Sequence, residues 1–321
     1  MPQPLVSVVI PSYNHAPYIE ATITSVLAQT YPHLELFVID DGSQDDSVAR
    51  ITRLLDERGD ARAQLIAREN RGLCPTLNEG LRLARGKYFA YLGSDDLWQP
   101  EKLERQVAAV EAAGDERVGA AFGDCYVIDA EGRRLDRYGR QYGYRGGDIY
   151  RDLLLMDFLP PSPTNFFVRE KLISVGGFNE DVKIEDYEMW LRVARRFRIA
   201  YVPEVVASFR VHRTNTSSNY PERMLVANCH ALGMAFEADP TLPVWLRRHA
   251  VARQHAGVAT VYYNALDLRR ARREALKSLV LYPLEGRAWR VALGSLLGAS
   301  VVNHLRERRR AALAYDEAQG S

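Results

Sequence analysis

The sequence predicts an α/β protein with a doubly wound, mostly parallel central sheet and a helical C-terminal extension. Four short apolar runs occur in the first hundred residues, at Leu5–Ile10, Leu34–Ile39, Gln64–Ala67 and Tyr88–Leu92. Runs that are apolar at nearly every position indicate strands covered on both faces, as in parallel sheets. Helical patterns separate these runs, and such strand–helix alternation is typical of doubly wound folds.

The helices between these strands have recognisable ends. Pro17 suits the first turn of one helix. Asp45-Asp46-Ser47 begins a second, because acids favour the N-terminal end of the helix dipole. Further along we expect these elements: helices over 73–84 and 100–113, strands over 118–122, 126–128, 165–168 and 202–211, an exposed loop over 131–150, a helix over 185–197, and helices from 221 onward.

Composition and charge indicate a globular protein with a basic C-terminal segment. The 321 residues are 47% hydrophobic and 26% charged, and the net charge of +1 gives no sign of a nucleic-acid partner. Residues 247–310 hold 14 Lys/Arg and 4 Asp/Glu, whereas residues 1–246 carry a net charge of −7. Three widely spaced cysteines form neither a zinc motif nor a disulfide framework, which predicts a reducing cytoplasm. We expect no signal peptide and no membrane-spanning helix, since no apolar run reaches about 18 residues.

Two pairs of neighbouring aspartates follow predicted strands, Asp40-Asp41 after the second and Asp95-Asp96 after the fourth. The carboxyl ends of parallel strands are where open α/β sheets bind ligands. Adjacent carboxylates repel each other unless a cation or a donor-rich ligand lies between them. Hard oxygen ligands such as Asp96 suit Mg²⁺ or Mn²⁺, and His212 can add a further ligand. The alternative is a set of solvated acidic turns and a structural histidine.

Three other positions are candidates for chemistry. Tyr13 can offer an aromatic face to a base, or it can be a packed core residue. Asp41 can accept a hydrogen bond from a base edge, or it can be a turn residue. Asp186, beside Glu185 at a helix start, can serve as a general base or as a helix cap. The sequence holds neither a Gly-x-Gly-x-x-Gly fingerprint nor a P-loop, so a diphosphate would need a metal.

Taken together, these motifs resemble glycosyltransferase family 2. The resemblance runs in order to about residue 215 and leaves the last hundred residues uncovered. It implies a GT-A fold and an inverting transfer of a sugar from a nucleotide donor. The motifs are Val6–Asn14, Ile39–Ser43, Asn70-Arg71-Gly72, Asn78-Glu79-Gly80, Ala84-Arg85-Gly86, Asp95-Asp96, Gly176-Gly177-Phe178, Glu185-Asp186 and Arg210-Val211-His212. On this basis we expect a nucleotide-sugar-binding half over 1–98, an acceptor-binding and catalytic half over 99–215, and a basic helical extension over 216–321.

The resemblance also implies roles for single residues. It places Tyr13 on the base, Asp41 on the base edge, and Asp95 near the ribose or sugar of the donor. Asp96 would bind the Mn²⁺ or Mg²⁺, with His212 as a weaker candidate ligand. Asp186 would be the general base. The remaining expected site residues are Pro11, Asp40 and Arg71 on the donor side and Glu185 and Trp190 as acceptor or supporting residues.

Two departures refine this expectation. The loop reads Ser94-Asp95-Asp96 in place of Asp-x-Asp with an acid at both ends, which favours one metal ligand from this loop over two. No Gln-x-x-Arg-Trp follows Asp186, so we expect the addition of a single sugar, from a UDP donor, to a glycan or lipid-linked hydroxyl acceptor in bacterial surface polysaccharide or glycoconjugate assembly. The alternatives are a non-catalytic sugar-nucleotide or glycan-binding protein and a sugar-phosphate nucleotidyltransferase.

The C-terminal segment carries a separate expectation. An apolar-faced helix is predicted over Trp289–Leu305, and Arg306-Glu307-Arg308-Arg309-Arg310 follows it. A helix with basic flanks can lie on an anionic membrane surface, which would place the protein at the inner face of the membrane. The alternative is a helical cap that packs on the body of the protein or on a second subunit.

Overall fold

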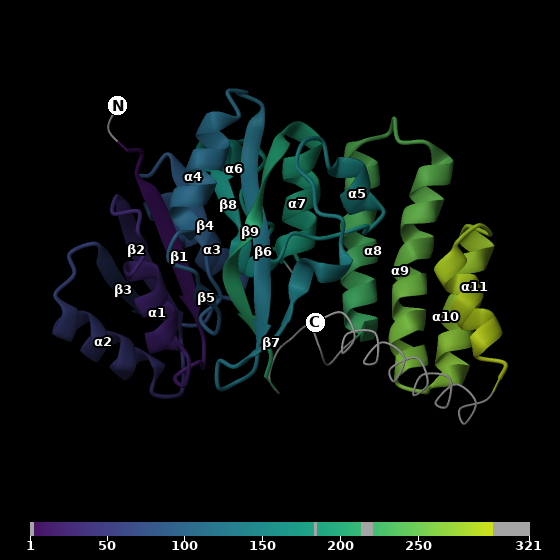
Figure 1. The fold of residues 1–321 in the computed structure, drawn as a ribbon, viewed down its shortest axis with the longest axis horizontal. Coiled ribbons are helices and arrows are strands. Elements are labelled where there is room, and N and C mark those ends of the chain that lie inside the picture. The colour runs from purple at the N-terminus through teal and green to yellow at the C-terminus, as the bar shows by residue number, and fades with distance from the viewer. Residues whose placement is uncertain (1–2, 183–184, 213–220, 298–321) are drawn as a thin grey trace, which may run out of the picture. The chain divides into compact units, whose positions relative to one another are not determined.

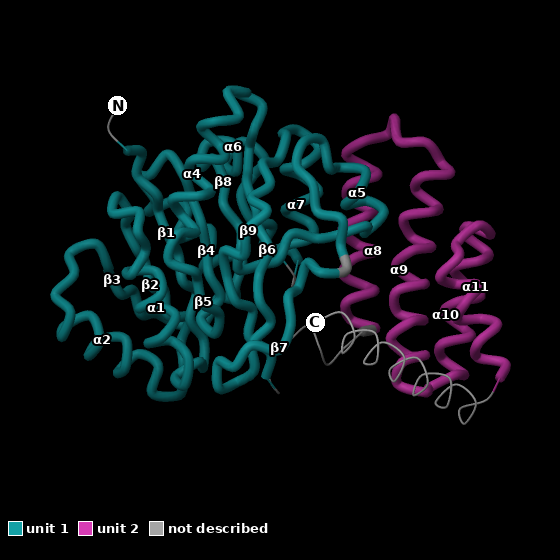
Figure 2. Tube along the Cα trace, viewed as in Figure 1, with its two compact units in different colours: residues 1–215 teal, residues 216–321 magenta. Residues whose placement is uncertain are grey.

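The computed structural model describes residues 3–182, 185–212 and 221–297. The chain divides into two compact units, residues 1–215 and residues 216–321. Figure 1 shows the elements of both, and Figure 2 colours the two units separately. Unit 1 is an α/β unit built on one sheet, whereas the described part of unit 2 is helical.

The first half of the sheet in unit 1 is parallel throughout. β1 pairs with β2 and with β4, and β2 pairs with β3, all in the parallel sense. The strands are β1 (Val6–Ser12), β2 (Leu34–Asp41), β3 (Ala63–Arg68) and β4 (Tyr88–Tyr91). The helices are α1 (Ile19–Leu27), α2 (Ser47–Arg58), α3 (Leu73–Leu83) and α4 (Lys102–Ala112). The predicted alternation is confirmed, and the order β3-β2-β1-β4 puts all four carboxyl ends at one edge.

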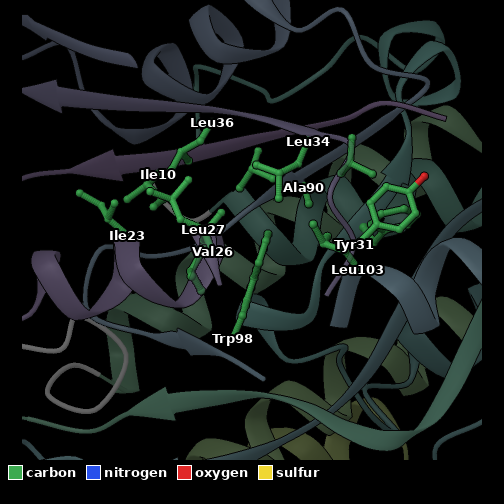
Figure 3. Packing of buried hydrophobic residues seen from close by; sticks show 14 of the residues in the cluster. Ile10, Ile23, Val26, Leu27, Tyr31, Leu34, Leu36, Ala90, Trp98 and Leu103 are labelled. Atoms are coloured by element: carbon green, nitrogen blue, oxygen red, sulfur yellow. The ribbon is translucent and has the colours of Figure 1, made fainter. Parts of the chain in front are cut away.

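The apolar strand positions form the main core of unit 1. Figure 3 shows Ile10 of β1 and Leu36 of β2 near Ile23, Val26 and other residues of α1. On the other side of β1, α3 packs closely because Gly80 has no side chain. A Cβ at this glycine would lie 2.4 Å from a methyl carbon of Val9. Continuous burial of β1 and β2 therefore explains why their sequences are apolar almost throughout.

The second half of the sheet mixes directions. β8 pairs antiparallel with both β4 and β6, while β6 pairs parallel with β9. The elements are β5 (Leu97–Trp98), β6 (Val118–Ile128), β7 (Arg134–Arg137), η1 (Tyr138–Gln141), α5 (Tyr150–Leu154), η2 (Ser162–Thr164), β8 (Phe166–Val168), α6 (Arg169–Ser174), α7 (Glu185–Arg196) and β9 (Arg198–Arg210). In full, the path of the sheet is β3-β2-β1-β4-β8-β6-β9-β5, with β7 beside β6.

Two expectations for this half were wrong in detail. The strands predicted on either side of Gly123-Asp124 are one strand, β6. Asp124 stays within it because Arg137 forms an ion pair with its buried carboxylate, which also accepts hydrogen bonds from the backbone N–H groups of Cys125 and Gly139, each at 2.8 Å. The expected exposed loop over 131–150 holds the edge strand β7 and the short helix η1.

Unit 2 has a core of its own. Its described elements are α8 (Pro221–Ala238), α9 (Val244–Asn264), α10 (Leu268–Leu281) and α11 (Gly286–Gly294). Small residues from α9, α10 and α11, including Ala259, Ala275 and Ala288, allow close packing of these helices. No helix in the described ranges is long and apolar enough to cross a membrane.

The helix predicted over Trp289–Leu305 is shorter than expected. α11 ends at Gly294, where the chain tightens into turns closed by the backbone N–H groups of Leu296 and Leu297. The guanidinium of Arg272 donates to the carbonyl of Ser295 at 2.7 Å and satisfies this helix end. Residues 298–310, including the arginine run, lie outside the described residues.

Candidate active site

Three loops meet near the carboxyl ends of β1, β4 and β9. The backbone carbonyls of Ser94 and Asp96, in the loop after β4, both accept hydrogen bonds from the hydroxyl of Thr22 on α1, at 3.0 and 2.9 Å. On the β9 side, the backbone N–H of Arg210 donates to Asp96 Oδ1 at 2.8 Å. The Arg210 guanidinium donates to the Asp95 carbonyl at 2.7 Å. The aspartate loop is therefore held from two sides.

The side chains of His15, Asp95 and His212 form a group that can hold a divalent metal ion. One ligand atom from each lies within 4.8 Å of the others. His212 Nε2 is 2.9 Å from Asp95 Oδ2, and the rings of His15 and His212 meet edge to face at 5.7 Å. His15 Nδ1 lies 2.7 Å from the hydroxyl of Ser94, which fixes the orientation of its ring. Two imidazoles with one carboxylate suit a transition ion such as Mn²⁺ better than Mg²⁺.

The electrostatics of this group favour a bound cation. Burial lowers the pKa of His15, an effect that the Asp95 carboxylate opposes and His212 reinforces. A neutral imidazole is the form that binds a metal. The lowered pKa of His15 therefore favours the neutral ring that could ligate a cation beside the Asp95 carboxylate.

Asp96, which we expected to bind the metal, has a different environment. Its side chain is 4% exposed, and one carboxylate oxygen accepts the Arg210 backbone N–H. Burial raises the pKa of Asp96, and repulsion from Asp95 adds to the effect. The carboxylate beside the histidines belongs instead to Asp95, which we expected near the ribose or sugar of the donor. Asp95 thus joins Asp96 as a candidate metal ligand, and the ligand role of Asp96 stays a prediction.

His15 was absent from the candidates found by sequence. Its signal was its place two residues after Tyr13, on the loop that leaves β1 and lies beside the loop that leaves β4. Tyr18 was also overlooked. Its ring lies 5.0 Å from the ring of His212, and the Arg210 guanidinium sits 4.9 Å from its centroid. These contacts join α1 to the end of β9.

The aspartate pair at the end of β2 organises the neighbouring loops. Asp40 is buried, and its carboxylate accepts hydrogen bonds from the hydroxyl of Ser12 at 3.0 Å and from the N–H and hydroxyl of Ser43. Asp41 forms an ion pair with Arg68 and accepts the backbone N–H groups of Arg71 and Gly72, each at 2.8 Å.

Other predicted donor-side residues are more accessible. The Tyr13 ring is 47% exposed, which suits a stacking surface. The Arg71 side chain is exposed on the loop that Asp41 holds, while Pro11 is half-buried in β1 opposite Ile39. The structure thus separates Asp40, which fixes the loops, from Tyr13 and Arg71, which face outward.

The acid pair Glu185-Asp186 begins α7. Asp186 Oδ1 accepts the backbone N–H of Tyr187 at 2.6 Å, and Glu185 Oε1 lies 3.5 Å from the hydroxyl of Tyr91 on β4. Burial raises the pKa of Asp186. Burial and repulsion from Asp186 raise the pKa of Glu185 to about 8. A carboxylate with a raised pKa is a stronger base near neutral pH.

Trp190 lies one turn further along α7 and is fully buried. Its indole N–H donates to Asn165 Oδ1 at 3.1 Å, and its ring lies 5.2 Å from that of Phe167. The residue therefore offers no surface to an acceptor. It supports the helix that carries Asp186.

Comparison with known proteins identifies the family. A profile described as Glycosyl transferase family 2 matches residues 7–175, more than half of the chain. The chain belongs to glycosyltransferase family 2. It is 34% identical over 233 residues to an uncharacterized glycosyltransferase of Haemophilus influenzae, and the match covers 68% of each chain. A putative teichuronic acid biosynthesis glycosyltransferase of Bacillus subtilis is 31% identical, with 68% of this chain and 83% of the relative covered.

Solved glycosyltransferases share the fold. A mannosyltransferase of Pyrobaculum calidifontis, in complex with GDP-Man and Mn²⁺, aligns with a TM-score of 0.59 at 24% identity over 94% of this chain and 87% of that one. TarS of S. aureus with UDP-GlcNAc aligns with a TM-score of 0.61 at 19% identity over 90% of each chain. The family 2 chain therefore has the predicted GT-A fold.

Proposed function

We propose that this glycosyltransferase transfers one sugar, with inversion, from a nucleotide sugar to a hydroxyl group of an acceptor in a metal-dependent reaction. The observation that carries the proposal is that one unit contains both a candidate metal-binding group, His15, Asp95 and His212, and two acids with raised pKa values, Glu185 and Asp186. The two are linked through β4, since Asp95 follows that strand and Tyr91 within it contacts Glu185.

The proposed donor site lies around Tyr13, Asp41 and Arg71. The exposed ring of Tyr13 would stack on the base, and the Arg71 side chain would face the donor from the loop held by Asp41. Two solved relatives of the fold are complexes with GDP-Man and UDP-GlcNAc, which supports a nucleotide-sugar donor. We infer UDP as the nucleotide, because one aspartate suits the imide edge of uracil.

His15, Asp95 and His212 would hold Mn²⁺, with Mg²⁺ as the weaker candidate. A divalent ion there supplies positive charge against the leaving diphosphate. The protein's contribution is a fixed ligand set: Ser94 orients His15, and Arg210 holds the loop that carries Asp95. The Mn²⁺ in the Pyrobaculum complex supports this proposal.

Asp186 is the proposed general base. It would remove the proton from the acceptor hydroxyl as that oxygen attacks the anomeric carbon, while the glycosidic bond to the diphosphate breaks. Burial raises the pKa of Asp186, which favours its uptake of that proton. Attack opposite the leaving group inverts the anomeric centre.

The setting is proposed from relatives. The name of the Bacillus protein, a putative teichuronic acid biosynthesis glycosyltransferase, supports a role in bacterial surface polysaccharide or glycoconjugate assembly. We infer a cytoplasmic setting and a glycan or lipid-linked acceptor from the family resemblance. The missing Gln-x-x-Arg-Trp motif supports non-processive addition.

The deciding experiment measures binding and hydrolysis of a nucleotide-sugar panel with and without Mn²⁺. We expect the native protein to bind one donor selectively and to hydrolyse it only when Mn²⁺ is present. The Asp95→Ala variant should show neither the selective binding nor the Mn²⁺-dependent hydrolysis. Asp56→Ala, at an exposed position of α2, is the matched control and should behave as the native protein. Donor binding without turnover, even with a range of acceptors, would favour the non-catalytic binding protein. Failure to bind any donor would overturn the proposal.

A further inference from the structure

One end of unit 2 is a surface built where three helices meet. α9 begins there, α10 ends there and α11 begins there. The Arg248 guanidinium donates to the carbonyls of Val280 and Leu281, at 3.2 and 3.1 Å. The ring of His249 stacks on that of Tyr282 with centroids 3.9 Å apart. These contacts hold the end of the unit in one arrangement.

Five apolar side chains from these elements point outward, and we name them the apolar end face. They are between 48% and 80% exposed, and two of them are tryptophans. Single exposed apolar residues are ordinary, but a group from three neighbouring elements marks an interaction site. The residues are Val244, Trp245, Val280, Leu284 and Trp289.

Exposed cations lie around this face, and Glu285 within it points inward, whereas Glu237 and Asp239 precede the start of α9. Lys277, Arg287 and Arg290 are exposed around it, as is Arg248. Glu285 is buried, where its carboxylate accepts the backbone N–H of Arg287 and lies 3.1 Å from His249 Nε2. The described surface at this end therefore combines apolar side chains with positive charge.

A groove beside the face is mostly apolar. Its volume is about 470 Å³, and Leu276, Val280 and Leu281 line it together with His255, Arg273 and Lys277. The nitrogen atoms of these three side chains contact the buried carboxylate of Glu274. The groove therefore extends the apolar part of this surface.

We propose that the apolar end face docks on an anionic membrane surface. Tryptophan favours the interface between headgroups and acyl chains, where Leu284 and Val280 would enter and the arginines would meet lipid phosphates. Charge complementarity decides against a second copy as the occupant. In a two-fold contact the same cations would face each other. The proposal does not depend on the transfer reaction.

The apolar end face differs from the membrane contact that the sequence predicted, a helix over Trp289–Leu305 followed by an arginine run. α11 ends at Gly294, and residues 298–310 lie outside the described residues, so that expectation stays a prediction. Trp289 belongs to both surfaces. Val244 and Trp245 are distant in the sequence from Val280 and Leu284, and the packing of α9 against α10 brings the two pairs together.

The test is flotation of the full-length protein with vesicles of phosphatidylcholine and phosphatidylglycerol, compared with vesicles of phosphatidylcholine alone. We expect binding to the anionic vesicles at low salt, a loss at high salt, and a blue shift of tryptophan fluorescence. Trp98 and Trp190 are buried, so the shift would report on Trp245 and Trp289.

Two variants divide the contributions. Val280→Glu with Leu284→Glu should abolish flotation, and Arg287→Glu with Arg290→Glu should weaken it at least tenfold, since each basic residue adds about 1 kcal/mol near an anionic surface. Val226→Glu is the matched control, because Val226 is 70% exposed on α8 and should leave binding unchanged. Circular dichroism would verify that each variant is folded.

Binding that persists in the Val280→Glu, Leu284→Glu variant would overturn the proposal, as would absence of binding by the native protein at low salt. Analytical sedimentation tests whether a second copy of the chain occupies the apolar end face instead. A native dimer that the same variant converts to a monomer, without vesicle binding, would assign the face to a second copy.

Discussion

Two acid pairs of unit 1, Asp95-Asp96 and Glu185-Asp186, look alike in sequence but differ in their surroundings. In Asp95-Asp96 the second acid accepts the backbone N–H of Arg210, and the first faces His15 and His212. In Glu185-Asp186, burial raises the pKa of both acids, and the Asp186 carboxylate accepts the backbone N–H of Tyr187. The difference teaches that neighbouring charges can be used in two ways. In the function that we propose, the first pair lies at a cation site, whereas the second pair accepts a proton.

The largest effect should come from the proton-accepting pair. We expect Asp186→Asn to lower kcat by about 10² to 10⁴, because the amide cannot take the proton of the acceptor. Donor affinity and Mn²⁺ affinity should stay near native values, since the proposed metal group is on other loops. Single-turnover kinetics with parallel calorimetry would measure both. A variant that keeps its kcat would show that Asp186 is not the base.

A smaller effect should follow in the cation-accepting pair. Asp95→Asn removes the carboxylate from between the two histidines, and we expect Mn²⁺ affinity to fall by more than about 100-fold. The indirect partner Ser94→Ala should cost about tenfold, as is usual for groups that orient a ligand. Titration followed by the Mn²⁺ resonance signal would check this order. Equal affinities in native and Asp95→Asn protein would contradict the proposed site.

Variants of Asp96 distinguish its structural role from the proposed metal-binding role of Asp95. Asp96→Ala leaves the buried N–H of Arg210 without its acceptor, which should lower the free energy of unfolding by about 1–3 kcal/mol. Asp96→Asn retains an acceptor oxygen and should be much closer to native stability. Thermal unfolding of the two variants without added metal is the measurement. A reversed order would mean that the charge of Asp96, and not its oxygen, holds the loop.

The smallest effect concerns pH. Glu185 has a pKa of about 8 in the folded protein against an ordinary value of 4.5, so its burial as an anion destabilises the fold increasingly as pH rises between these values. We expect Glu185→Gln to be more stable than native at pH 9 and equal to it at pH 4. Thermal unfolding of both proteins at pH 4 and pH 9 is the measurement. Equal stability of the two proteins at pH 9 would show that burial of Glu185 as an anion does not destabilise the fold.

Much of the fold could be predicted because β1, β2 and β4 are buried on both faces. Their sequences therefore report burial directly. β6 could not be predicted as one strand, since Asp124 is tolerated only through Arg137 and two N–H groups that fold back onto it. The end of α11 likewise depends on a side chain, Arg272, from another helix. Contacts between residues that are distant in the sequence leave no local sequence pattern from which they could be predicted.

The candidate site shows the same division. The sequence placed the acids at strand ends, because strand direction fixes those ends. It favoured Asp96 as the metal ligand, whereas the structure places Asp95 beside His15 and His212, because the backbone N–H of Arg210 on β9 engages the Asp96 carboxylate. His15 was missed because its partner Ser94 lies 79 residues away, on a neighbouring strand end.

The hydroxyl of Thr22 bears on how fast a metal ion can bind at the proposed site. It bonds the carbonyls of Ser94 and Asp96, so the loop between them is shaped by α1 before any ligand arrives. Little conformational entropy then remains to be lost when an ion enters. Metal uptake should proceed without a slow rearrangement of the chain, at a rate governed by the water that the ion must shed.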